Sequence, residues 1–292
     1  MSSSQMRALD QSRVIDCAGR KLNLDRPRLM GILNVTPDSF SDGGRFLSTQ
    51  KAVSHALHMQ ESGADLIDVG GESTRPGAQD VSGQEELDRV IPVIESIVAQ
   101  TDIPVSVDTS KPEVMREAAR AGACMINDVY ALRRPGALEM AAQLGLPVCL
   151  MHMQGEPRSM QQAPHYEDVV AEVEVFLLER AAACEAAGLQ RTNILLDPGF
   201  GFGKRLDHNL ALFRALPRLA ARGFPLLVGL SRKSMLDQLT GRAIDERLAG
   251  SLTLAVLAAR AGASVIRVHD VAETRDAVDV MTAIWPGSGG KE

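Results

Sequence analysis

Nine polar residues of the chain each follow a short apolar run, and side chains of these types can bind a polar ligand. An Asp or Asn at such a position is often only a helix cap or a turn residue, because its side chain accepts hydrogen bonds from nearby backbone N–H groups. The same position recurring along the whole chain favours a shared site over separate caps. The nine residues are Asn34, Asp68, Asp108, Asn127, His152, Asp197, Ser231, Arg267 and His269.

Three of these residues suit a planar ligand edge that carries N–H donors. Asp108 and Asp197 supply carboxylate acceptors, and Asn127 supplies an amide. A buried carboxylate opposite two parallel donors forms a strong bidentate arrangement. We therefore expect a guanidine-like or aminopyrimidinone group at this site.

Arg267 lies within the last apolar run, and His269 directly follows that run. Since the two residues are two positions apart, their side chains lie on the same side of a strand. Arg binds anions well because its planar guanidinium presents several donors. The alternative for Arg267 is a salt bridge to Asp68 or Asp108, and the sequence leaves both open.

Two segments predict loops that approach a ligand. The segment DPGFGFGK, residues 197–204, has three alternating glycines that allow a close backbone approach, but Arg205 follows Lys204 where a Walker A motif needs Ser or Thr. The segment GLSRKSML, residues 229–236, passes from a strand into a helix. Its polar residues are expected at the helix N-terminus, where backbone N–H groups favour an anion.

Residues 34–46 and 70–83 form long polar connections, which predict mobile lids or binding loops. A resident metal is not expected. His55 and His58 share a helix face without a third ligand, so we interpret them as surface residues. The only cation we expect is a hard one brought in by substrate phosphates, with Asn34 as an oxygen ligand.

The elements that must position these residues alternate between strand and helix. Each predicted strand is short and apolar on both faces, as buried parallel strands are. Eight βα units without any GxGxxG motif favour a single-domain α/β (β/α)8 TIM barrel over a doubly wound sheet. The predicted strands are residues 29–35, 66–69, 105–107, 125–127, 148–151, 194–196, 226–230 and 265–268.

Two helix starts carry a capping-box pattern. Ser82 precedes Glu85 by three residues, and Ser110 precedes Glu113 in the same way. Pro112 fits the first turn of the second helix, where a missing N–H does no harm.

No linker interrupts residues 28–285, so we expect one barrel domain there. Residues 1–27 are expected to form an N-terminal extension with a β-hairpin, built from residues 14–16 and 22–24, that closes the bottom of the barrel. Residues 286–292, PGSGGKE, predict a disordered tail.

Composition excludes several classes of protein. A net charge of -6 and 3% aromatic residues argue against nucleic acid as a partner. The longest charge-free apolar stretch, residues 248–259, falls short of the roughly 20 residues of a membrane span. The N-terminus shows no secretory signal, and the four Cys residues form no CxxC pattern, so we expect a cytoplasmic protein with reduced thiols.

Eight segments occur in an order that resembles the dihydropteroate synthase family of the bacterial folate pathway. They are MGILNVTPDSFSDGG, DVGGESTRPGA, SVDTSKPEV, INDV, CLMHMQG, LLDPGFGFGK, GLSRKSML and IRVHDV, and the likeness covers residues 28–271. The resemblance implies an enzyme that joins 6-hydroxymethyl-7,8-dihydropterin diphosphate to p-aminobenzoate and releases diphosphate with the help of Mg2+. It also implies a homodimer packed through outer helices and a pocket for sulfonamides, which are similar to p-aminobenzoate.

The resemblance implies the following site residues. For the pterin they are Asp108, Asn127, Met151, Asp197, Gly229 and Lys233, and for the diphosphate Asn34, Arg267 and His269, with Asn34 also as the metal ligand. For p-aminobenzoate they are Thr74, Arg75, Pro76, Phe202, Arg232 and Ser234, and for a closing lid Asp38 and Phe40. Asp108, Asp197, Lys233 and Arg267 are the expected catalytic residues of a dissociative, SN1-like reaction.

Two alternatives stay open. A methyltetrahydrofolate-binding methyltransferase barrel shares the Asp and Asn pattern, but it lacks the two long loops and works with a corrinoid domain for which this chain has no residues. A non-catalytic paralogue would bind a pterin or a protein partner without synthesis, and it would be expected to have lost Asn34, Arg267, His269 or the lid loops, all of which are present.

Overall fold

Eight short strands form the centre of the molecule. The side chains of each strand are apolar on both faces, so both faces are buried. The computed structural model describes residues 14–36, 44–73, 80–156 and 159–285. The strands are β3 (Arg28–Asn34), β4 (Leu66–Gly70), β5 (Val105–Asp108), β6 (Met125–Asp128), β7 (Val148–Met151), β8 (Ile194–Asp197), β9 (Leu227–Gly229) and β10 (Val265–Val268).

All neighbouring strands of this sheet are parallel, in the order β8-β7-β6-β5-β4-β3-β10-β9. A parallel bridge between Leu196 and Leu226 joins the two ends and closes the barrel. The predicted (β/α)8 class is confirmed. No strand end differs from its prediction by more than one residue: β3 begins and ends one residue earlier than predicted, and β9 is one residue shorter at each end than the predicted residues 226–230.

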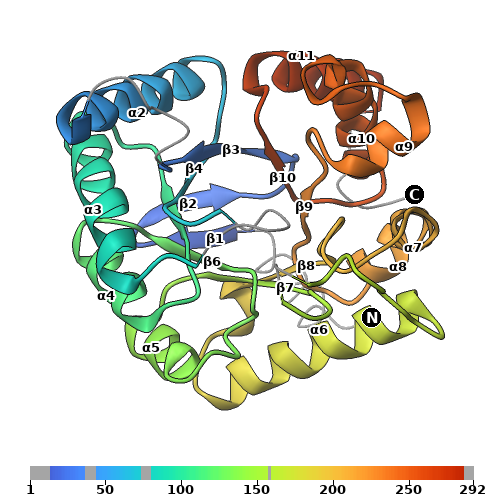
Figure 1. The fold of residues 1–292 in the computed structure, drawn as a ribbon, viewed down its shortest axis with the longest axis horizontal. Helices are drawn as coiled ribbons and strands as arrows, with labels where there is room; N and C mark the ends of the chain where they lie inside the picture. Colours follow the sequence, from blue (N-terminus) through green and yellow to red (C-terminus); the bar gives the residue numbers. More distant parts are fainter. Residues whose placement is uncertain (1–13, 37–43, 74–79, 157–158, 286–292) are drawn as a thin grey trace, which may run out of the picture.

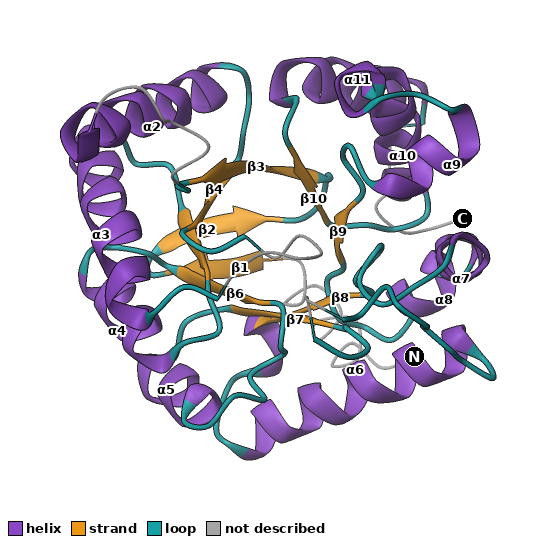
Figure 2. Ribbon diagram, viewed as in Figure 1, coloured by secondary structure: helices purple, strands orange, loops and turns teal. Residues whose placement is uncertain are grey.

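Helices surround the strands on the outside (Figures 1 and 2). Their apolar faces pack on the barrel: Val90, Ile94 and Ile97 of one helix are fully buried in the same core as Ile67 and Val105. The helices are α2 (Gly44–Glu61), α3 (Gly83–Gln100), α4 (Pro112–Arg120), α5 (Ala137–Leu144), α6 (Val169–Ala186), α7 (Leu206–Arg214), α8 (Leu216–Ala220), α9 (Ser234–Thr240), α10 (Leu248–Arg260) and α11 (Val271–Ile284), with short 3-10 turns η2 (Arg191–Asn193) and η3 (Ile244–Glu246).

An antiparallel hairpin, β1 (Val14–Cys17) and β2 (Arg20–Asn23), precedes the barrel, as predicted. Ala18 and Gly19 both have positive φ, which is typical of the tight turns that join hairpin strands. The buried side chains of the hairpin pack against residues from the beginnings of the barrel strands. This floor cluster consists of Ile15, Cys17, Leu22, Leu24, Met30, Leu66, Cys124, Met125, Cys149, Leu195, Leu227 and Val265.

One of the two predicted capping boxes is confirmed. The Ser82 hydroxyl accepts from the backbone N–H of Glu85 at 3.2 Å, and the Glu85 carboxylate accepts from the N–H of Ser82 at 3.0 Å. The box at Ser110 is wrong, because the helix begins at Pro112 and its N-cap is Lys111, which makes no side-chain cap. Ser110 therefore lies one residue too early to cap. Pro112 lies in the first turn as predicted, and it is the first helical residue.

Among the described residues, no helix is long and apolar enough to cross a membrane.

Candidate active site

The register of the sheet brings most of the predicted pterin and diphosphate residues to one end of the barrel. Asn34, Gly70 and Asp108 are paired across β3, β4 and β5, and Asp108 is in turn paired with Asn127 of β6. Two further pairs join Met151 to Asp197 and Gly229 to Arg267. Since the carboxyl ends of all eight strands open on one face, this face is the candidate active site.

Arg267 lies at the centre of the charge network on this face. Its Nε donates to Asp68 Oδ2 at 2.6 Å, and its Nη2 donates to Asp108 Oδ2 at 2.9 Å. The Asn127 amide also donates to Asp68 Oδ2, at 2.9 Å. The salt bridges that the sequence left as an alternative are therefore present, and through them Arg267, Asp108 and Asn127 are held in one cluster.

Asp68 is the residue of this cluster to which sequence reasoning gave no binding role. It is fully buried, and it accepts from both Arg267 and Asn127. Its position at the end of an apolar run placed it among the nine polar candidates, but nothing in the sequence assigned it to a particular ligand. Among the described residues its second oxygen, Oδ1, has no hydrogen-bond partner, and neither has the hydroxyl of Ser106, its paired neighbour on β5. Buried polar atoms are normally satisfied, so this pair suits a polar ligand or water that bears donors.

Burial sets the protonation of the site. It raises the pKa of Asp108 to about 7, with Arg267 opposing the shift and Asp68 adding to it. Burial likewise raises the pKa of Asp197 to about 6, against the N–H of Gly199 and the ammonium of Lys233. Burial alone would lower the pKa of Arg267, but the carboxylates of Asp68 and Asp108 raise it, so the guanidinium stays charged. Both aspartates thus change charge close to neutral pH.

An apolar surface lies beside these charges. Met151 packs in a cluster with Val129, Tyr130, Met153 and Met160, and the ring of Phe202 packs against this cluster. The Lys233 ammonium lies 4.2 Å from the centre of the Phe202 ring, a cation–π contact. A flat ligand can therefore meet both an apolar face and a polar edge here.

The glycines in the loop after β8 were predicted to allow a close approach to a ligand, but in the structure they allow a close approach to another part of the backbone. Gly199, Gly201 and Gly203 have positive φ. A Cβ at Gly199 would lie 1.9 Å from the carbonyl oxygen of His152, and one at Gly203 would lie 2.4 Å from that of Gln154. The close approach in this structure is thus to the backbone that follows β7, and no side chain larger than hydrogen fits at Gly199 or Gly203.

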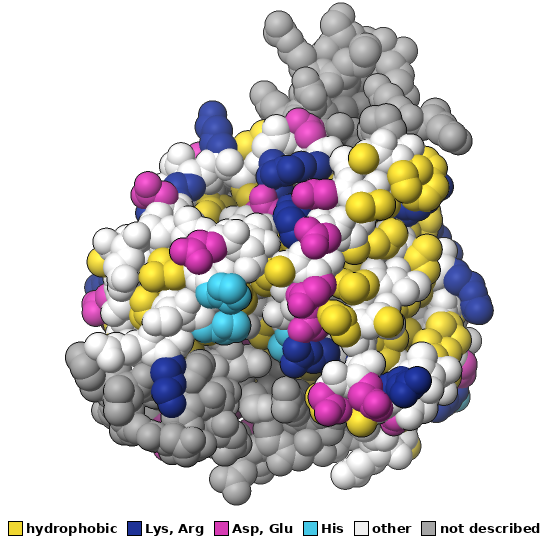
Figure 3. Space-filling view, turned by 90° about the horizontal axis from the view of Figure 1, so that it is seen from above, with side chains coloured by type: hydrophobic (Ala, Val, Ile, Leu, Met, Phe, Trp, Pro, Cys, Tyr) yellow, Lys and Arg dark blue, Asp and Glu magenta, His cyan; other side chains and the backbone are white. Residues whose placement is uncertain are grey.

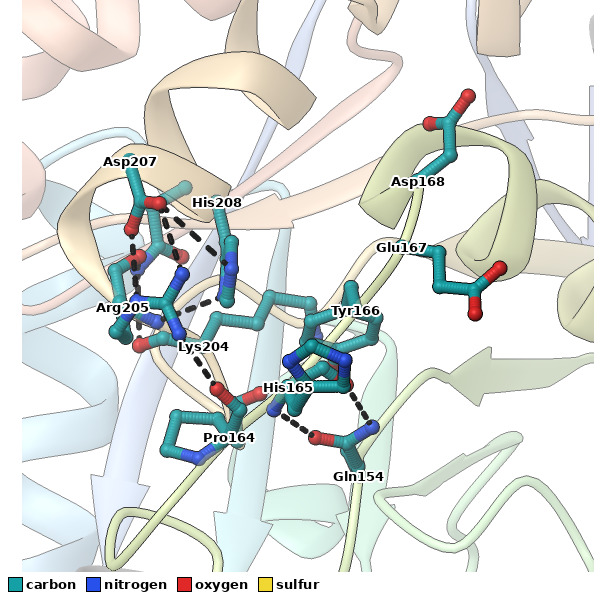
Figure 4. A network of polar contacts seen from close by, with 12 residues as sticks. Gln154, Pro164, His165, Tyr166, Glu167, Asp168, Lys204, Arg205, Asp207 and His208 are labelled. Carbon is teal, nitrogen blue, oxygen red and sulfur yellow. Dashed lines mark hydrogen bonds and ion pairs between the residues drawn. The ribbon is translucent and has the colours of Figure 1, made fainter.

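Lys204 ends this loop and is a second residue whose role sequence reasoning missed. It is 3% exposed, and its ammonium donates to the carbonyls of Gly199 at 2.9 Å and Phe202 at 3.0 Å. The same ammonium lies 2.9 Å from Nδ1 of His152 (Figure 4 shows the surrounding network). Burial and the Lys204 charge lower the pKa of His152 to about 2, so this histidine is neutral. In the sequence, Lys204 was considered only as part of a Walker A motif, and no pattern predicted that it would bind the carbonyls of its own loop.

The segment after β9 places its basic residues before the helix rather than in its first turn. Lys233 is the N-cap of α9, and Ser234 is the first helical residue. Arg232, with a positive φ, pairs with Asp270 through two hydrogen bonds. Ser234 lines a surface cavity of about 530 Å³ together with Lys204, Arg205, Asn209, Gln238 and residues 161–165.

The last strand continues into a contact with the β9 loop. His269 Nδ1 lies 3.0 Å from the hydroxyl of Ser231, and the N–H of His269 donates to the same hydroxyl at 3.3 Å. Ser231 and His269 are thus brought together as the sequence predicted.

Five predicted site residues lie outside the described residues: Asp38, Phe40, Thr74, Arg75 and Pro76. The described chain on either side of residues 74–79 is firmly held. Glu72 accepts from the N–H of Val81 at 3.1 Å and from Lys111 at 2.6 Å, and Lys111 also donates to the fully buried Glu86 at 2.5 Å.

No group of three or more metal-ligating side chains occurs in the part of the chain that the structure describes. His55 and His58 are exposed on α2, in agreement with their interpretation as surface residues. Asn34 is half-buried at the end of β3.

Comparison with known proteins gives a consistent result. The family model described as pterin binding enzyme matches residues 30–269. The chain is 58% identical to the dihydropteroate synthase of Escherichia coli strain K12 over 265 residues, which cover 91% of this chain and 94% of the relative.

Solved structures of high similarity carry the same name. The dihydropteroate synthase of Xanthomonas albilineans with 4-aminobenzoic acid is 58% identical, with a TM-score of 0.89 and coverage of 94% of this chain and 98% of that one. The Yersinia pestis dihydropteroate synthase in a sulfonamide drug complex is 53% identical, with a TM-score of 0.89 and coverage of 93% and 98%.

Proposed function

This chain belongs to the family of pterin-binding enzymes, and from this premise we infer that it catalyses the dihydropteroate synthase reaction. It is a transferase that joins 6-hydroxymethyl-7,8-dihydropterin diphosphate to p-aminobenzoate, forming 7,8-dihydropteroate and diphosphate. The observation that carries this conclusion is the Arg267 cluster with Asp68, Asp108 and Asn127 at the barrel mouth, which presents acceptors and an amide beside a fixed positive charge.

The pterin ring binds to Asp108, Asn127, Asp197 and Lys233, with Met151 and Gly229 beside them. Three features support this assignment: the two buried carboxylates suit the N–H donors of an aminopyrimidinone, the Asp68–Ser106 pair has unsatisfied polar atoms, and Met151 belongs to an apolar cluster for the ring face. Asp68 joins this set as the residue that orients Asn127 and Arg267.

The diphosphate binds to Asn34, Arg267 and His269. Arg267 keeps a positive charge in every relevant pH range, and His269 is held by Ser231 beside the same strand end. With Asn34 as the only expected protein ligand, the site suits Mg2+ that arrives with the diphosphate and takes most of its oxygens from substrate and water. When bound there, Mg2+ supplies electrostatic stabilisation of the leaving group.

p-Aminobenzoate binds beside Phe202 and Ser234, with Thr74, Arg75 and Pro76 from the loop after β4 and with Asp38 and Phe40 closing over the site. The cavity at Ser234 and the packing of Phe202 on the apolar cluster support this half of the site. Arg232 contributes to it only if it loosens its pair with Asp270. Sulfonamides are expected to compete for this pocket.

The reaction is dissociative. The bond between the pterin methylene carbon and the diphosphate oxygen breaks first, and the electron-rich ring stabilises the cation. The arylamine nitrogen then forms the new C–N bond and loses a proton. Arg267 and His269 stabilise the charge that builds on the diphosphate, while Asp108 and Asp197 favour positive charge on the ring, so catalysis is mainly electrostatic.

The test is diphosphate release from the pterin diphosphate with Mg2+, with and without p-aminobenzoate, while dihydropteroate is followed by chromatography. Coupled release and product formation support the synthase. Pterin binding by folded protein without any product would favour the non-catalytic paralogue. Methyl transfer from methyltetrahydrofolate to a corrinoid would favour the methyltransferase.

Two further proposals concern the whole protein. Exposed apolar side chains gather over the side formed by α10 and α11 (Figure 3), which supports a homodimer packed through these helices. They include Leu248, Leu257, Val280, Ile284 and Trp285. Light scattering of the wild type and of Val280→Asp tests this.

All four cysteines are free and buried, which supports a cytoplasmic location.

A further inference from the structure

Lys204 is the last residue of the glycine loop after β8, and its side chain folds back into the interior of this loop. Its ammonium has three protein carbonyls around it, those of Gly199 at 2.9 Å, Phe202 at 3.0 Å and His152 at 3.3 Å, and His152 Nδ1 is the fourth contact at 2.9 Å. An ammonium has three protons to donate, so all of them are used within the protein. Lys204 therefore does not present its charge to a ligand, although it lies within a few residues of the predicted substrate contacts.

The rest of the loop is held by other groups: the Asp197 carboxylate accepts from the N–H of Gly199 at 2.7 Å, and two neutral side chains contact the later glycines. The Tyr166 hydroxyl donates to the carbonyl of Gly203 at 2.8 Å, and the N–H of Gly201 donates to Asn209 Oδ1 at 2.9 Å. The carbonyls of Gly199 and Phe202 instead turn inward, where Lys204 donates to both, and the Gly199 carbonyl also accepts from the N–H of Phe202 at 3.1 Å. A carbonyl that is turned away from water and lacks a donor is costly, so the Phe202 carbonyl, to which Lys204 donates, cannot keep its orientation without the lysine.

The loop that Lys204 organises carries Phe202. The Phe202 carbonyl is bound to Lys204, and the Phe202 ring lies 4.2 Å below the Lys233 ammonium and against the cluster that contains Met151. The backbone position that Lys204 fixes therefore decides where this ring lies. Ser234, the first residue of α9, lines the adjacent cavity.

We propose that Lys204 is a positioning residue for the arylamine half of the reaction: by binding the carbonyls of Gly199, Phe202 and His152 it holds the Phe202 ring where p-aminobenzoate binds, without touching either substrate. This inference rests on the proposed function, since it concerns the same site.

The charge of Lys204 gives the proposal a pH signature. Burial lowers the pKa of Lys204 to about 7, with Asp197 opposing the shift and Lys233 adding to it. The neutral amine formed above this pH has one donor fewer for the carbonyls, so the loop loosens as the pH rises. The titratable and charged groups that face Lys204 and His152 are Tyr166, Asp197, Lys233, His208 and Arg133.

The experiment compares the wild type with Lys204→Met, which has similar volume and no charge, and with Lys204→Arg, which keeps a charge that does not titrate. Lys21→Met, at an exposed position on the hairpin, is the matched control. For Lys204→Met we expect KM for p-aminobenzoate to rise about 10-fold or more at saturating pterin diphosphate, while KM for the pterin diphosphate stays within about 2-fold of the wild type. Lys204→Arg should recover part of the loss.

The pH profile provides a second readout. Wild-type KM for p-aminobenzoate should rise between about pH 6 and about pH 9, because Lys204 loses its proton in this range, whereas the profile of Lys204→Arg should stay flat. If Lys204→Met does not fold, as judged by thermal denaturation, this comparison decides alone.

Equal KM values for p-aminobenzoate in folded Lys204→Met and the wild type would overturn the proposal, and so would parallel pH profiles of the wild type and Lys204→Arg. Failure of the proposed function looks different, since the wild type itself would then form no dihydropteroate.

Discussion

At the scale of single residues, Arg267 is the counter-charge of two buried carboxylates. It donates to Asp68 with one nitrogen and to Asp108 with another, so one guanidinium is shared by two carboxylates. A Lys side chain has only a point charge and cannot form this planar double contact. The residue that we propose to bind the diphosphate is therefore also the residue that opposes protonation of the pterin carboxylate Asp108.

Replacing Arg267 by Ala is expected to lower kcat/KM by at least about 100-fold, because the leaving group loses its main cation. Pterin affinity should fall as well, since Asp108 without Arg267 takes up a proton at a higher pH. Steady-state kinetics and calorimetric binding of 6-hydroxymethyl-7,8-dihydropterin measure the two effects. Arg267→Lys should be intermediate, and a near wild-type rate in Arg267→Ala would exclude the assigned role.

Asp197 gives a pH prediction of a definite sign. Its pKa is raised to about 6, so the carboxylate is ionised above this pH and protonated below it. Affinity for 6-hydroxymethyl-7,8-dihydropterin, which carries no phosphate, should therefore fall about 10-fold from pH 7.5 to pH 5. Calorimetric titration across this range is the measurement. Asp197→Asn should lose the part of the dependence that Asp197 causes, whereas the part caused by Asp108, whose pKa is raised to about 7, should remain. An affinity independent of pH would rule out this carboxylate as a pterin ligand.

At the scale of elements, Lys111 joins three consecutive parts of the barrel. It precedes α4, and it binds Glu72 from the loop after β4 and Glu86 from α3. Glu86 is fully buried, and burial raises its pKa while Lys111 and Thr109 oppose the shift. The ion pairs thus tie the chain on both sides of residues 74–79 to the barrel.

Replacing Lys111 by Met is expected to lower the free energy of unfolding by about 3–5 kcal/mol, because the buried Glu86 charge is left without its partner. Urea denaturation measures the change. The double variant Lys111→Met with Glu86→Gln should recover much of the loss, since it removes the uncompensated charge. A decrease below about 1 kcal/mol in the single variant would show that the network contributes little to stability.

At the scale of the whole molecule, the active site and the floor cluster occupy opposite ends of one barrel. The hairpin side chains Ile15 and Cys17 are fully buried against the beginnings of the strands, while the proposed catalytic residues follow the strand ends. In a (β/α)8 barrel the end at which the strands begin contributes stability, and the end at which the strands finish carries the catalytic residues.

Ile15→Ala is accordingly expected to cost about 2–5 kcal/mol of stability through the lost burial and the cavity left behind. Both KM values should remain unchanged when they are measured well below the unfolding transition. Denaturation and steady-state kinetics on the same preparation test both statements, with the exposed Lys21→Ala as the control. A clear change in either KM would mean that the hairpin influences the site.

How much the sequence predicts depends on the range of the interaction. Ser82 and Glu85 are three residues apart, and their capping box could be predicted because its geometry is local. The same pattern at Ser110 failed, since the helix start is set by Pro112. Arg267 and Asp68 are 199 residues apart, and sequence reasoning offered their ion pair only as one of two alternatives.

The sequence by itself determined the barrel, the hairpin and the end of the barrel that carries the polar residues, because short strands that are apolar on both faces, each followed by a polar residue, repeat along the chain. The tertiary structure alone decided which polar groups pair: Asp68 with Arg267 and Asn127, Lys111 with Glu86, and Lys204 with the carbonyls of its own loop. Buried charges and buried carbonyls must find partners wherever the fold places them, and no short-range pattern in the sequence encodes those partners.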